Sequence, residues 1–333
     1  MQSVFIVGGT GQIGRAVARR FVERGWDVIV SARHEGHVPE GARFVALDRA
    51  DGLDCTADVV VDVVAYERRD AEQLLALRGK VGALVVISSA AVYSDARGLT
   101  LDHATGPDDF PAVPVPIPER HRTVEPGDET YGTKKRALEL VLLEQDRMPA
   151  TVVRPGAVYG VGSPMPRELY FVKRILDGRR VVALAYRGAS RFHTTSVRNL
   201  ADVVVLAAER PGTRVVNCGD PEPPTVLEIA RTIASHFGHE WTELLVQGPP
   251  QGRVGETPWS VPAPFVLDMV AAEIDLRYRP VTSYRRAVGE VCDWIAAELR
   301  SRDWREAFPE AVPYMEHDFD YAAEDEFVRN LAA

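Results

Sequence analysis

The opening residues place a short apolar run directly before a cluster of glycines. Residues 3–7, SVFIV, lead into GGTGQIG at 8–14, and IGRAVARRFVERG at 13–25 then repeats its apolar residues at helical spacing. A strand that enters a glycine turn and leaves as a helix presents backbone N–H groups at the helix N-terminus. The pattern predicts a unit that binds the pyrophosphate of a dinucleotide, with a purely structural turn as the alternative.

Two glycine templates overlap in this loop. G-x-G-x-x-G begins at Gly9, and G-x-x-G-x-x-G begins at Gly8. A phosphate loop of the ATPase type is excluded, because Arg15 and Ala16 stand where that loop needs Lys and then Ser or Thr. The residues expected to contact a dinucleotide here are Gly8, Gly11, Gln12, Ile13 and Gly14.

Further apolar runs of strand length follow, with helical patterns or turns between some of them. They lie at 27–32, 42–48, 58–64, 83–93 and 150–160. Continuous apolar strands interleaved with helices imply a parallel sheet covered on both faces. We therefore expect an α/β protein with a doubly wound, Rossmann-type sheet in a dinucleotide-binding domain at 1–160. A smaller mixed α/β substrate domain at 161–333 would return to the first domain near 192–212.

Composition and charge exclude several classes of partner. The net charge is −9, which argues against a nucleic acid because proteins that bind phosphate backbones usually carry a basic face. No stretch approaches the roughly 20 apolar residues of a membrane span. Three widely spaced cysteines, Cys55, Cys218 and Cys292, fit a reducing compartment rather than a disulfide framework. We expect a cytoplasmic protein that acts on a small molecule and has no metal site.

The end of the second apolar run bears on which dinucleotide binds. NAD sites usually place a carboxylate there for the ribose hydroxyls, whereas this chain has Ser31, Ala32 and Arg33. A guanidinium can pair with a 2′-phosphate that a carboxylate would repel. NADP(H) is thus favoured, with NAD(H) as the alternative. Asp48, after the third run, is a candidate partner for the adenine amino group or a simple turn residue.

Two segments have unusual composition. Residues 94–127 are rich in proline and cannot form a regular helix or sheet. A long irregular loop of this kind is usually functional or disordered, and we expect residues 106–126 to form a substrate pocket with 160–190. The acidic segment at 316–327 is expected to be a solvated surface or a frayed end.

The stretch DETYGTKKRALELVLLE at 128–144 is predicted to be helical and places Lys135 one turn after Tyr131. A lysine at the head of an apolar row either extends its amine to water or serves a purpose in the site. The helix alone does not decide between a catalytic pair and an incidental one. Leu140 and Leu143 lie off the apolar row, which is compatible with a homodimer contact or with an ordinary core.

With the glycine loop, YGTKK at 131–135 and SSAAVY at 88–93, the chain resembles the extended short-chain dehydrogenase/reductase superfamily, which includes NAD(P)-dependent epimerases and dehydratases. The resemblance implies that Ser89, Tyr131 and Lys135 are catalytic. Ser89 would hold the substrate oxygen and Tyr131 would move the proton. Lys135 would lower the pKa of Tyr131, together with a cationic nicotinamide ring. The further cofactor contacts implied are Val63, Ala65, Lys135 and Pro155.

Three departures from the family pattern bear on the substrate. Ala90 and Ala91 replace the acidic pair that sugar-nucleotide dehydratases usually carry, so elimination of water lacks its second acid and base. Ala157 stands where an asparagine often contacts substrate. SRFHTTSVRNLAD at 190–202 matches the family's arginine-bearing strand imperfectly, so Arg191 and His193 are candidates for substrate contact or for ordinary surface and core roles.

The resemblance and its departures together indicate a function. We expect an NADP(H)-dependent oxidoreductase that reduces a carbonyl, or oxidises a secondary alcohol, on a sugar-like or secondary-metabolite substrate. One alternative is an NAD-dependent sugar-nucleotide epimerase with the same catalytic residues. The other is a non-catalytic regulatory or RNA-binding protein of the same fold, which an intact Tyr–Lys pair and the net charge of −9 disfavour.

Overall fold

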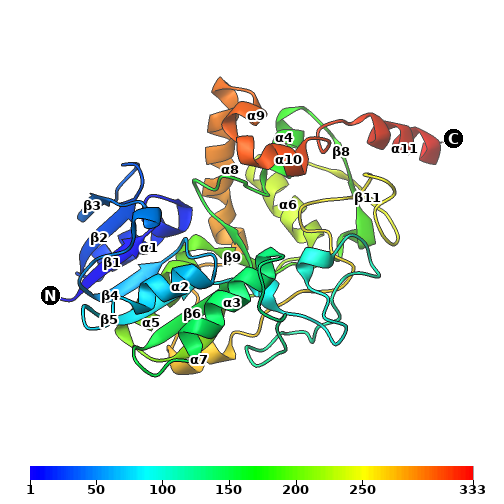
Figure 1. The fold of residues 1–333 in the computed structure, drawn as a ribbon. Helices are drawn as coiled ribbons and strands as arrows, with labels where there is room; N and C mark the ends of the chain where they lie inside the picture. The colour runs from blue at the N-terminus through cyan, green and yellow to red at the C-terminus, as the bar shows by residue number, and fades with distance from the viewer. Residues whose placement is uncertain (333) are drawn as a thin grey trace.

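The computed structural model describes residues 1–332 and is built around one seven-stranded sheet (Figure 1). The sheet has the order β10-β6-β5-β4-β1-β2-β3, and each neighbouring pair is parallel. Its strands are β1 (Ser3–Val7), β2 (Asp27–Ala32), β3 (Ala42–Ala46), β4 (Ala57–Asp62), β5 (Val81–Ile87), β6 (Ala150–Pro155) and β10 (Arg214–Cys218). The doubly wound parallel sheet predicted from the apolar runs is confirmed.

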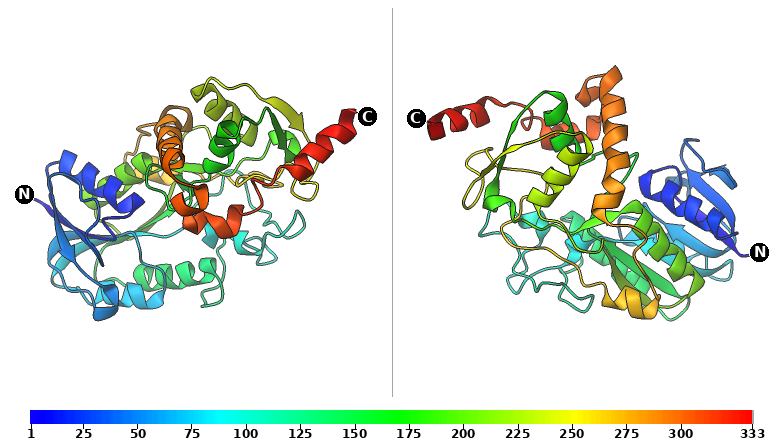
Figure 2. Two further views of the ribbon diagram at one scale, coloured as in Figure 1. Left: turned by 90° about the horizontal axis from the view of Figure 1, so that it is seen from above. Right: turned by 180° about the vertical axis from the view of Figure 1, so that it is seen from behind.

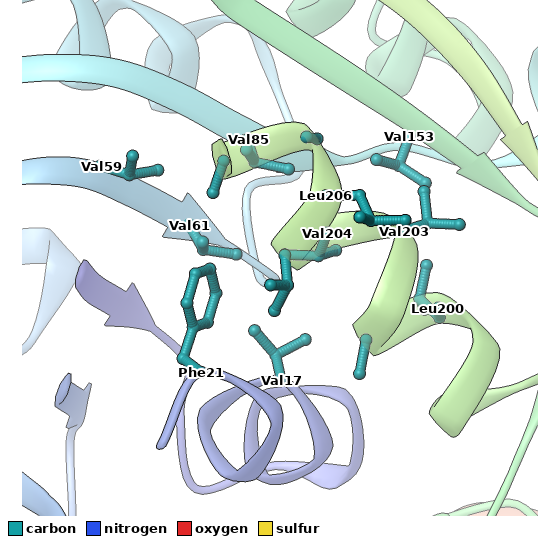
Figure 3. Close-up of a cluster of buried hydrophobic side chains, with 14 of the residues drawn as sticks. Val17, Phe21, Val59, Val61, Val85, Val153, Leu200, Val203, Val204 and Leu206 are labelled. Carbon is teal, nitrogen blue, oxygen red and sulfur yellow. The ribbon is translucent and has the colours of Figure 1, made fainter. Parts of the chain in front are cut away.

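Helices cover both faces of this sheet because both faces of its strands are apolar. On one face, α1 (Gln12–Glu23) and α5 (Val197–Glu209) pack over the sheet, and Figure 3 shows Phe21 and Val17 of α1 pointing at Val61 and Val204. On the other face, α2 (Arg68–Leu75) and α3 (Tyr131–Leu143) pack with Leu74, Leu138 and Leu142 buried beneath them. The two buried layers fix the position of the edge where the strands end.

A second core lies beside the sheet in the C-terminal half (Figure 2). It is formed by α4 (Leu169–Leu176), α6 (Val226–His236) and α8 (Tyr284–Ser301), with Trp259 and Trp304 fully buried. The remaining strands form two parallel pairs, β7 (Ala157–Tyr159) with β9 (Thr194–Ser196) and β8 (Val181–Leu184) with β11 (Thr242–Leu245). The remaining helices are α7 (Val270–Asp275), α9 (Trp304–Ala307), α10 (Val312–Met315) and α11 (Ala322–Ala332).

The chain crosses back to the large sheet after the second core has begun. Helix α5 returns at 197–209, and β10 at 214–218 then pairs with β6, so the return includes a strand beyond the predicted range of 192–212. The division into two domains at residue 160 remains a prediction. Among residues 1–332, no helix combines the length and apolar character that a membrane crossing requires.

The proline-rich segment is anchored in place by one carboxylate and by isolated bridges. Asp95 Oδ1 accepts from the backbone N–H groups of Arg97 and Leu99, and its Oδ2 accepts from that of Ala112 at 3.2 Å. Ile117 pairs with Leu267 as an isolated bridge to the C-terminal part of the chain. The segment contains one short 3₁₀ helix, η3 (Leu101–His103), and tertiary contacts give the rest of it a defined path.

The acidic segment at 316–327 is mostly exposed, as expected from its composition, but one of its carboxylates is buried. It contains helix α11, whose Glu324 is buried and lies 2.9 Å from Arg174 and 3.0 Å from Arg179. Asp325 also pairs with Arg179, at 2.5 Å. The burial of Glu324 could not be predicted from composition, because the two arginines that pair with these carboxylates lie about 150 residues earlier in the chain.

Candidate active site

The glycine loop between β1 and α1 needs glycine at its two ends for different reasons. Gly8 has a φ of +84°, and a Cβ at that position would lie 2.4 Å from Cγ1 of Val64. A Cβ at Gly14 would lie 2.2 Å from the carbonyl oxygen of Gly8. The first glycine allows the turn, and the second allows the helix to pack against it, as a phosphate-binding turn requires.

The first turn of α1 is open to an anion. Gly11 precedes the helix, and no side chain caps it. The first N–H groups of a helix have no intrahelical partner, and with the helix dipole they attract phosphate. Gln12 and Ile13 contribute such groups, while the Gln12 side chain donates to the carbonyl oxygen of Gly160 at 2.9 Å. The loop therefore fits the pyrophosphate of a dinucleotide.

Arg33 and Asp48 follow two adjacent strands at one edge of the sheet. Arg33 comes directly after β2, and its side chain is exposed. Asp48 follows β3, and its Oδ1 accepts from the backbone N–H of Ala50 at 2.9 Å, which caps a short 3₁₀ turn. Asp48 thus has the turn role weighed from the sequence, and its contact with adenine remains a prediction.

The remaining cofactor candidates end or follow the central strands. Val63 and Ala65 follow β4, and Pro155 is the last residue of β6. Ala65 and Pro155 are buried, and Val63 is half-buried. Their shared position at the carboxyl edge fits the general place of ligands in open parallel sheets, so their cofactor contacts stay as predicted.

The structure brings the three catalytic candidates together. Ser89 lies two residues after β5 and caps the short helix η2 (Ala90–Val92), with its Oγ accepting from the N–H of Ala91 at 3.1 Å. Tyr131 opens α3, and the nearby Ser89 side chain acts to lower the pKa of its phenol. The Lys135 Nζ lies 5.7 Å from the centre of the Tyr131 ring.

Lys135 is buried and held by the ends of two strands. Its Nζ donates to the carbonyl oxygens of Ala65 at 2.6 Å and Ile87 at 3.0 Å. Burial lowers the pKa of this ammonium to about 8, although the nearby carboxylates of Asp62 and Glu139 act in the opposite direction. The amine of Lys135 is therefore bound inside the protein and does not extend to water.

The pKa of Tyr131 is raised, which differs from the lowering expected from its lysine neighbour. Loss of solvent around the hydroxyl is the largest cause, although the whole residue remains 40% exposed, and the charges of Tyr66 and Asp102 add to the rise. The ammonium of Lys135 is directed to two carbonyl oxygens instead of to the phenol oxygen. The protein by itself therefore holds Tyr131 as a proton donor.

A second phenol and ammonium lie beside this pair. The rings of Tyr66 and Tyr131 are 5.7 Å apart at an angle of 45°, and the Nζ of Lys134 lies 5.4 Å from the centre of the Tyr66 ring. Both tyrosines are about two-fifths exposed. Sequence analysis missed Tyr66 because nothing in the order of residues indicates that it meets α3.

Glu139 continues the row of Tyr131 and Lys135 by one further turn, and sequence analysis also missed it. Its Oε1 accepts from Ser88 Oγ at 2.6 Å and from Arg154 Nε at 2.8 Å, and its Oε2 accepts from Arg154 Nη2 at 2.6 Å. All three side chains are buried. The i+8 spacing from Tyr131 was the available signal, and the network ties α3 to the ends of β5 and β6.

The two candidates for substrate contact on the arginine-bearing strand have ordinary roles. His193 is buried, its Nε2 lies 2.7 Å from the carbonyl oxygen of Asp220, and its Nδ1 accepts from Leu267 N–H at 3.0 Å. Burial lowers the pKa of His193 to about 4, so it stays neutral. Arg191 is exposed and donates to the carbonyl oxygen of Pro223. These are the core and surface roles weighed from the sequence.

One sizeable cavity does not coincide with the predicted site. It has a volume of about 620 Å³ and lies along α1, α5 and α8, and Gln12 is the one predicted cofactor residue that lines it. The catalytic candidates Ser89, Tyr131 and Lys135 do not line it. We assign the candidate active site from the chemistry of the side chains, because volume alone does not identify a reacting centre.

Within residues 1–332, no cluster of three or more His, Cys, Asp or Glu is placed to hold a metal ion.

A glycine turn at the head of α1, on a seven-stranded parallel sheet that carries Ser89, Tyr131 and Lys135, is the architecture of an NAD(P)-binding short-chain dehydrogenase/reductase. The chain is an enzyme of this type. It belongs to the NAD-dependent epimerase/dehydratase family, whose sequence model matches residues 4–219. The family resemblance inferred from the three motifs is confirmed.

Two characterised relatives are similar in sequence. A dTDP-6-deoxy-L-talose 4-dehydrogenase (NAD(P)(+)) from Kitasatospora kifunensis is 28% identical over 314 residues, covering 88% of this chain and 95% of the relative. A dTDP-L-rhamnose 4-epimerase from Burkholderia thailandensis is 28% identical over 201 residues, covering 57% of this chain and 53% of the relative. The first similarity spans both the sheet and the C-terminal half.

Solved structures share the fold at low identity. The UDP-N-acetylglucosamine 4-epimerase from Bacillus cereus superposes with a TM-score of 0.67 at 18% identity, covering 89% of this chain and 100% of its own. The UDP-glucuronic acid 4-epimerase from Bacillus cereus, solved with UDP-glucuronic acid and NAD, gives a TM-score of 0.64 at 17% identity. This likeness covers 89% of the present chain and 99% of the epimerase chain. These likenesses establish the fold of the chain and leave its reaction to its own residues.

Proposed function

We propose that this chain is an NADP(H)-dependent oxidoreductase acting on a secondary alcohol or the matching ketone of a nucleotide-linked deoxysugar. The proposal rests mainly on Ser89 and Tyr131, which lie close enough for Ser89 to affect the pKa of the phenol, beside the buried ammonium of Lys135. The similarity to a dTDP-6-deoxy-L-talose 4-dehydrogenase over most of both chains supports the substrate class. Ala90 and Ala91 support net redox chemistry, because they leave no second acid and base for elimination.

The residues of the site divide the work of such a reaction. The nicotinamide, when bound, supplies or accepts the hydride. In the direction of reduction, Ser89 Oγ binds the carbonyl oxygen and the Tyr131 hydroxyl gives it a proton as the alcohol forms. Tyr131 suits this role because its pKa is raised, so the phenol is protonated at neutral pH. Lys135 keeps a positive charge near the phenol at pH values below about 8.

NADP(H) is proposed over NAD(H) because of Arg33. It follows β2 at the place where NAD sites usually have a carboxylate, and its side chain is exposed. Its guanidinium is therefore available to pair with a 2′-phosphate. The relative from Kitasatospora kifunensis is named for both cofactors, and one epimerase structure of this fold contains NAD.

A sugar-nucleotide 4-epimerase is the second candidate. One relative is named a dTDP-L-rhamnose 4-epimerase, and the same Ser89, Tyr131 and Lys135 would serve it. An epimerase oxidises and then re-reduces its substrate, so it shows no net change in cofactor. Net reduction of NADP⁺ by a sugar nucleotide therefore separates the two proposals.

Formation of a homodimer through α3 also stays a prediction, although Leu143 packs against the core of its own chain.

The experiment is a turnover assay with dTDP-6-deoxy-L-talose and NADP⁺, followed at 340 nm and by NMR of the sugar. Wild type should reduce NADP⁺ as a ketone forms, and Tyr131→Phe should lower kcat by roughly 10²- to 10⁴-fold. Cofactor binding, measured by fluorescence titration, should be unchanged in that variant. An inverted sugar without net NADPH would favour the epimerase, and full activity in Tyr131→Phe would refute the catalytic assignment.

A further inference from the structure

The cavity of about 620 Å³ lies outside the proposed redox site and has a basic lining. Four arginines line it, from α1 and α5, together with His37. Two glutamates, Glu23 and Glu290, are the carboxylates of the lining. A surplus of guanidinium groups in a chain with a net charge of −9 is unexpected unless they meet an anion.

Two of the four arginines are neutralised by their neighbours and two are not. Arg20 pairs with Asp202, and Arg198 pairs with Glu290 at 2.6 Å. Across residues 1–332, neither Arg15 nor Arg19 has a carboxylate oxygen within 4.0 Å. Like charges four residues apart on a helix repel each other, so Arg15 and Arg19 slightly destabilise α1 when no anion is bound.

The guanidinium of Arg15 lies against the loop that follows β7. A Cβ at Gly162 would lie 1.7 Å from Nη2 of Arg15, so the guanidinium occupies the space that a side chain would need there. Gly162 also has a φ of +82°. The same loop accepts the hydrogen bond from Gln12 at Gly160. Arg15 is thus half-buried against this loop, whereas Arg19 is exposed.

We infer that this cavity binds the diphosphate group of a small phosphorylated molecule through Arg15 and Arg19, separately from the dinucleotide. Side chains four residues apart on a helix are neighbours at about 6 Å, which suits two linked phosphates. Guanidinium groups also pair bidentately with phosphate oxygens. The volume is within the usual range for a small-molecule site. Of the predicted cofactor residues only Gln12 lines the cavity, and the glycines of the phosphate-binding loop are not in its lining.

The test is a calorimetric titration of inorganic pyrophosphate into the full-length protein with saturating NADP(H). We expect binding, weakened roughly tenfold in each of Arg15→Gln and Arg19→Gln through loss of charge-assisted hydrogen bonds. Arg300→Gln is the matched control, because Arg300 is exposed in the last turn of α8 and outside the cavity. It should bind like wild type.

Three results would overturn the inference. They are an absence of pyrophosphate binding at millimolar concentration, loss of binding when NADP(H) saturates its own site, and equal binding by wild type and both cavity variants. Circular dichroism of Arg15→Gln and Arg19→Gln shows whether each variant is folded, and one folded variant is enough to test pyrophosphate binding. The readout is binding and not turnover, so failure of the proposed redox reaction leaves this test intact.

Discussion

Glu139 and Arg154 form a bidentate ion pair with both side chains buried, at 2.8 Å and 2.6 Å. The pair lies directly behind the candidate active site, because Glu139 is one turn after Lys135 and also binds the residue before Ser89. A buried pair of this kind gains little stability over an apolar pair, yet breaking it leaves an uncompensated charge. Its value to the site is that it fixes α3 against the ends of β5 and β6.

Substituting Glu139→Gln should therefore destabilise the protein and disturb catalysis together. We expect the free energy of unfolding to fall by about 3 kcal/mol, because Arg154 keeps its charge in the interior without a counter-charge. Urea unfolding followed by fluorescence measures this loss. Glu144→Gln, on the exposed residue that ends α3, is the control and should change stability by less than about 0.5 kcal/mol. Equal stability of the two variants would contradict the assigned role.

Lys135 should make stability depend on pH in the alkaline range. Burial lowers its pKa to about 8 in the folded protein from the ordinary value of 10.5, so the unfolded chain binds the proton more tightly. Stability linked to this group therefore rises as pH increases from 8 to 10.5, by up to about 3 kcal/mol. The difference in unfolding free energy between wild type and Lys135→Met should grow in favour of wild type across this window. A difference that is constant with pH would refute the shift.

Tyr66 should act by positioning Tyr131. The two rings are in contact at 5.7 Å, and an aromatic pair of this kind contributes about 0.5–1.5 kcal/mol. Tyr66→Ala should thus lower kcat by roughly 2- to 10-fold and leave the folded state intact, whereas Tyr66→Phe should keep kcat near wild type. Steady-state kinetics with separate kcat and KM values test this. Tyr314→Ala, at a residue that is 71% exposed, is the control. Identical kcat in Tyr66→Ala and wild type would exclude the role.

Local sequence predicted the parts of the fold that depend on neighbouring residues. The glycines at 8–14 and the apolar runs determine the first strand, the turn and the parallel sheet through backbone conformation and periodicity. The resemblance to the short-chain dehydrogenase/reductase superfamily implied which serine, tyrosine and lysine would meet. The predictions of the strand, the turn and the sheet needed no knowledge of which distant residues lie in contact.

The remaining features depend on contacts that no sequence pattern encodes. The role of Glu139 follows from its hydrogen bonds with Ser88 and Arg154, which lie on two other elements of the fold. The rise in the pKa of Tyr131 follows from local burial, which the i,i+4 spacing to a lysine does not reveal. The buried Glu324 in an acidic segment likewise depends on arginines far away in the chain. In each case a charge or polar group is interpreted correctly only together with its partner.

Arg33 should determine the preference between the two dinucleotides. Replacing it by alanine removes the guanidinium that would pair with the 2′-phosphate, so NADP(H) affinity should fall roughly tenfold or more while NAD(H) affinity changes little. Fluorescence titration at low ionic strength gives both dissociation constants, since salt screens an exposed contact. Arg147→Ala, at an exposed site beyond α3, is the control. Equal weakening of both cofactors would place Arg33 away from the 2′ position.

Asp95 should make the proline-rich segment sensitive to acid. Burial acts to raise the pKa of this carboxyl, but hydrogen bonds from the backbone N–H groups of Ala112, Leu99 and Arg97, and from the Arg97 side chain, lower it to about 2. The ordinary value is 3.8, so the folded state binds the proton less tightly than the unfolded chain. The carboxylate thus contributes stability that is fully present above pH 3.8 and is lost as the pH falls toward 2.

Asp95→Asn should remove this contribution at neutral pH, because the amide oxygen and NH₂ group cannot accept all four hydrogen bonds. We expect a loss of about 1–2 kcal/mol in the free energy of unfolding and faster proteolysis within residues 94–127. The loss should be large at pH 7 and small near pH 2, when the wild-type carboxyl is itself becoming protonated. Asp146→Asn, at an exposed residue beyond α3, should show no such dependence. A deficit in Asp95→Asn that is the same at both pH values would mean that its hydrogen bonds do not depend on the negative charge.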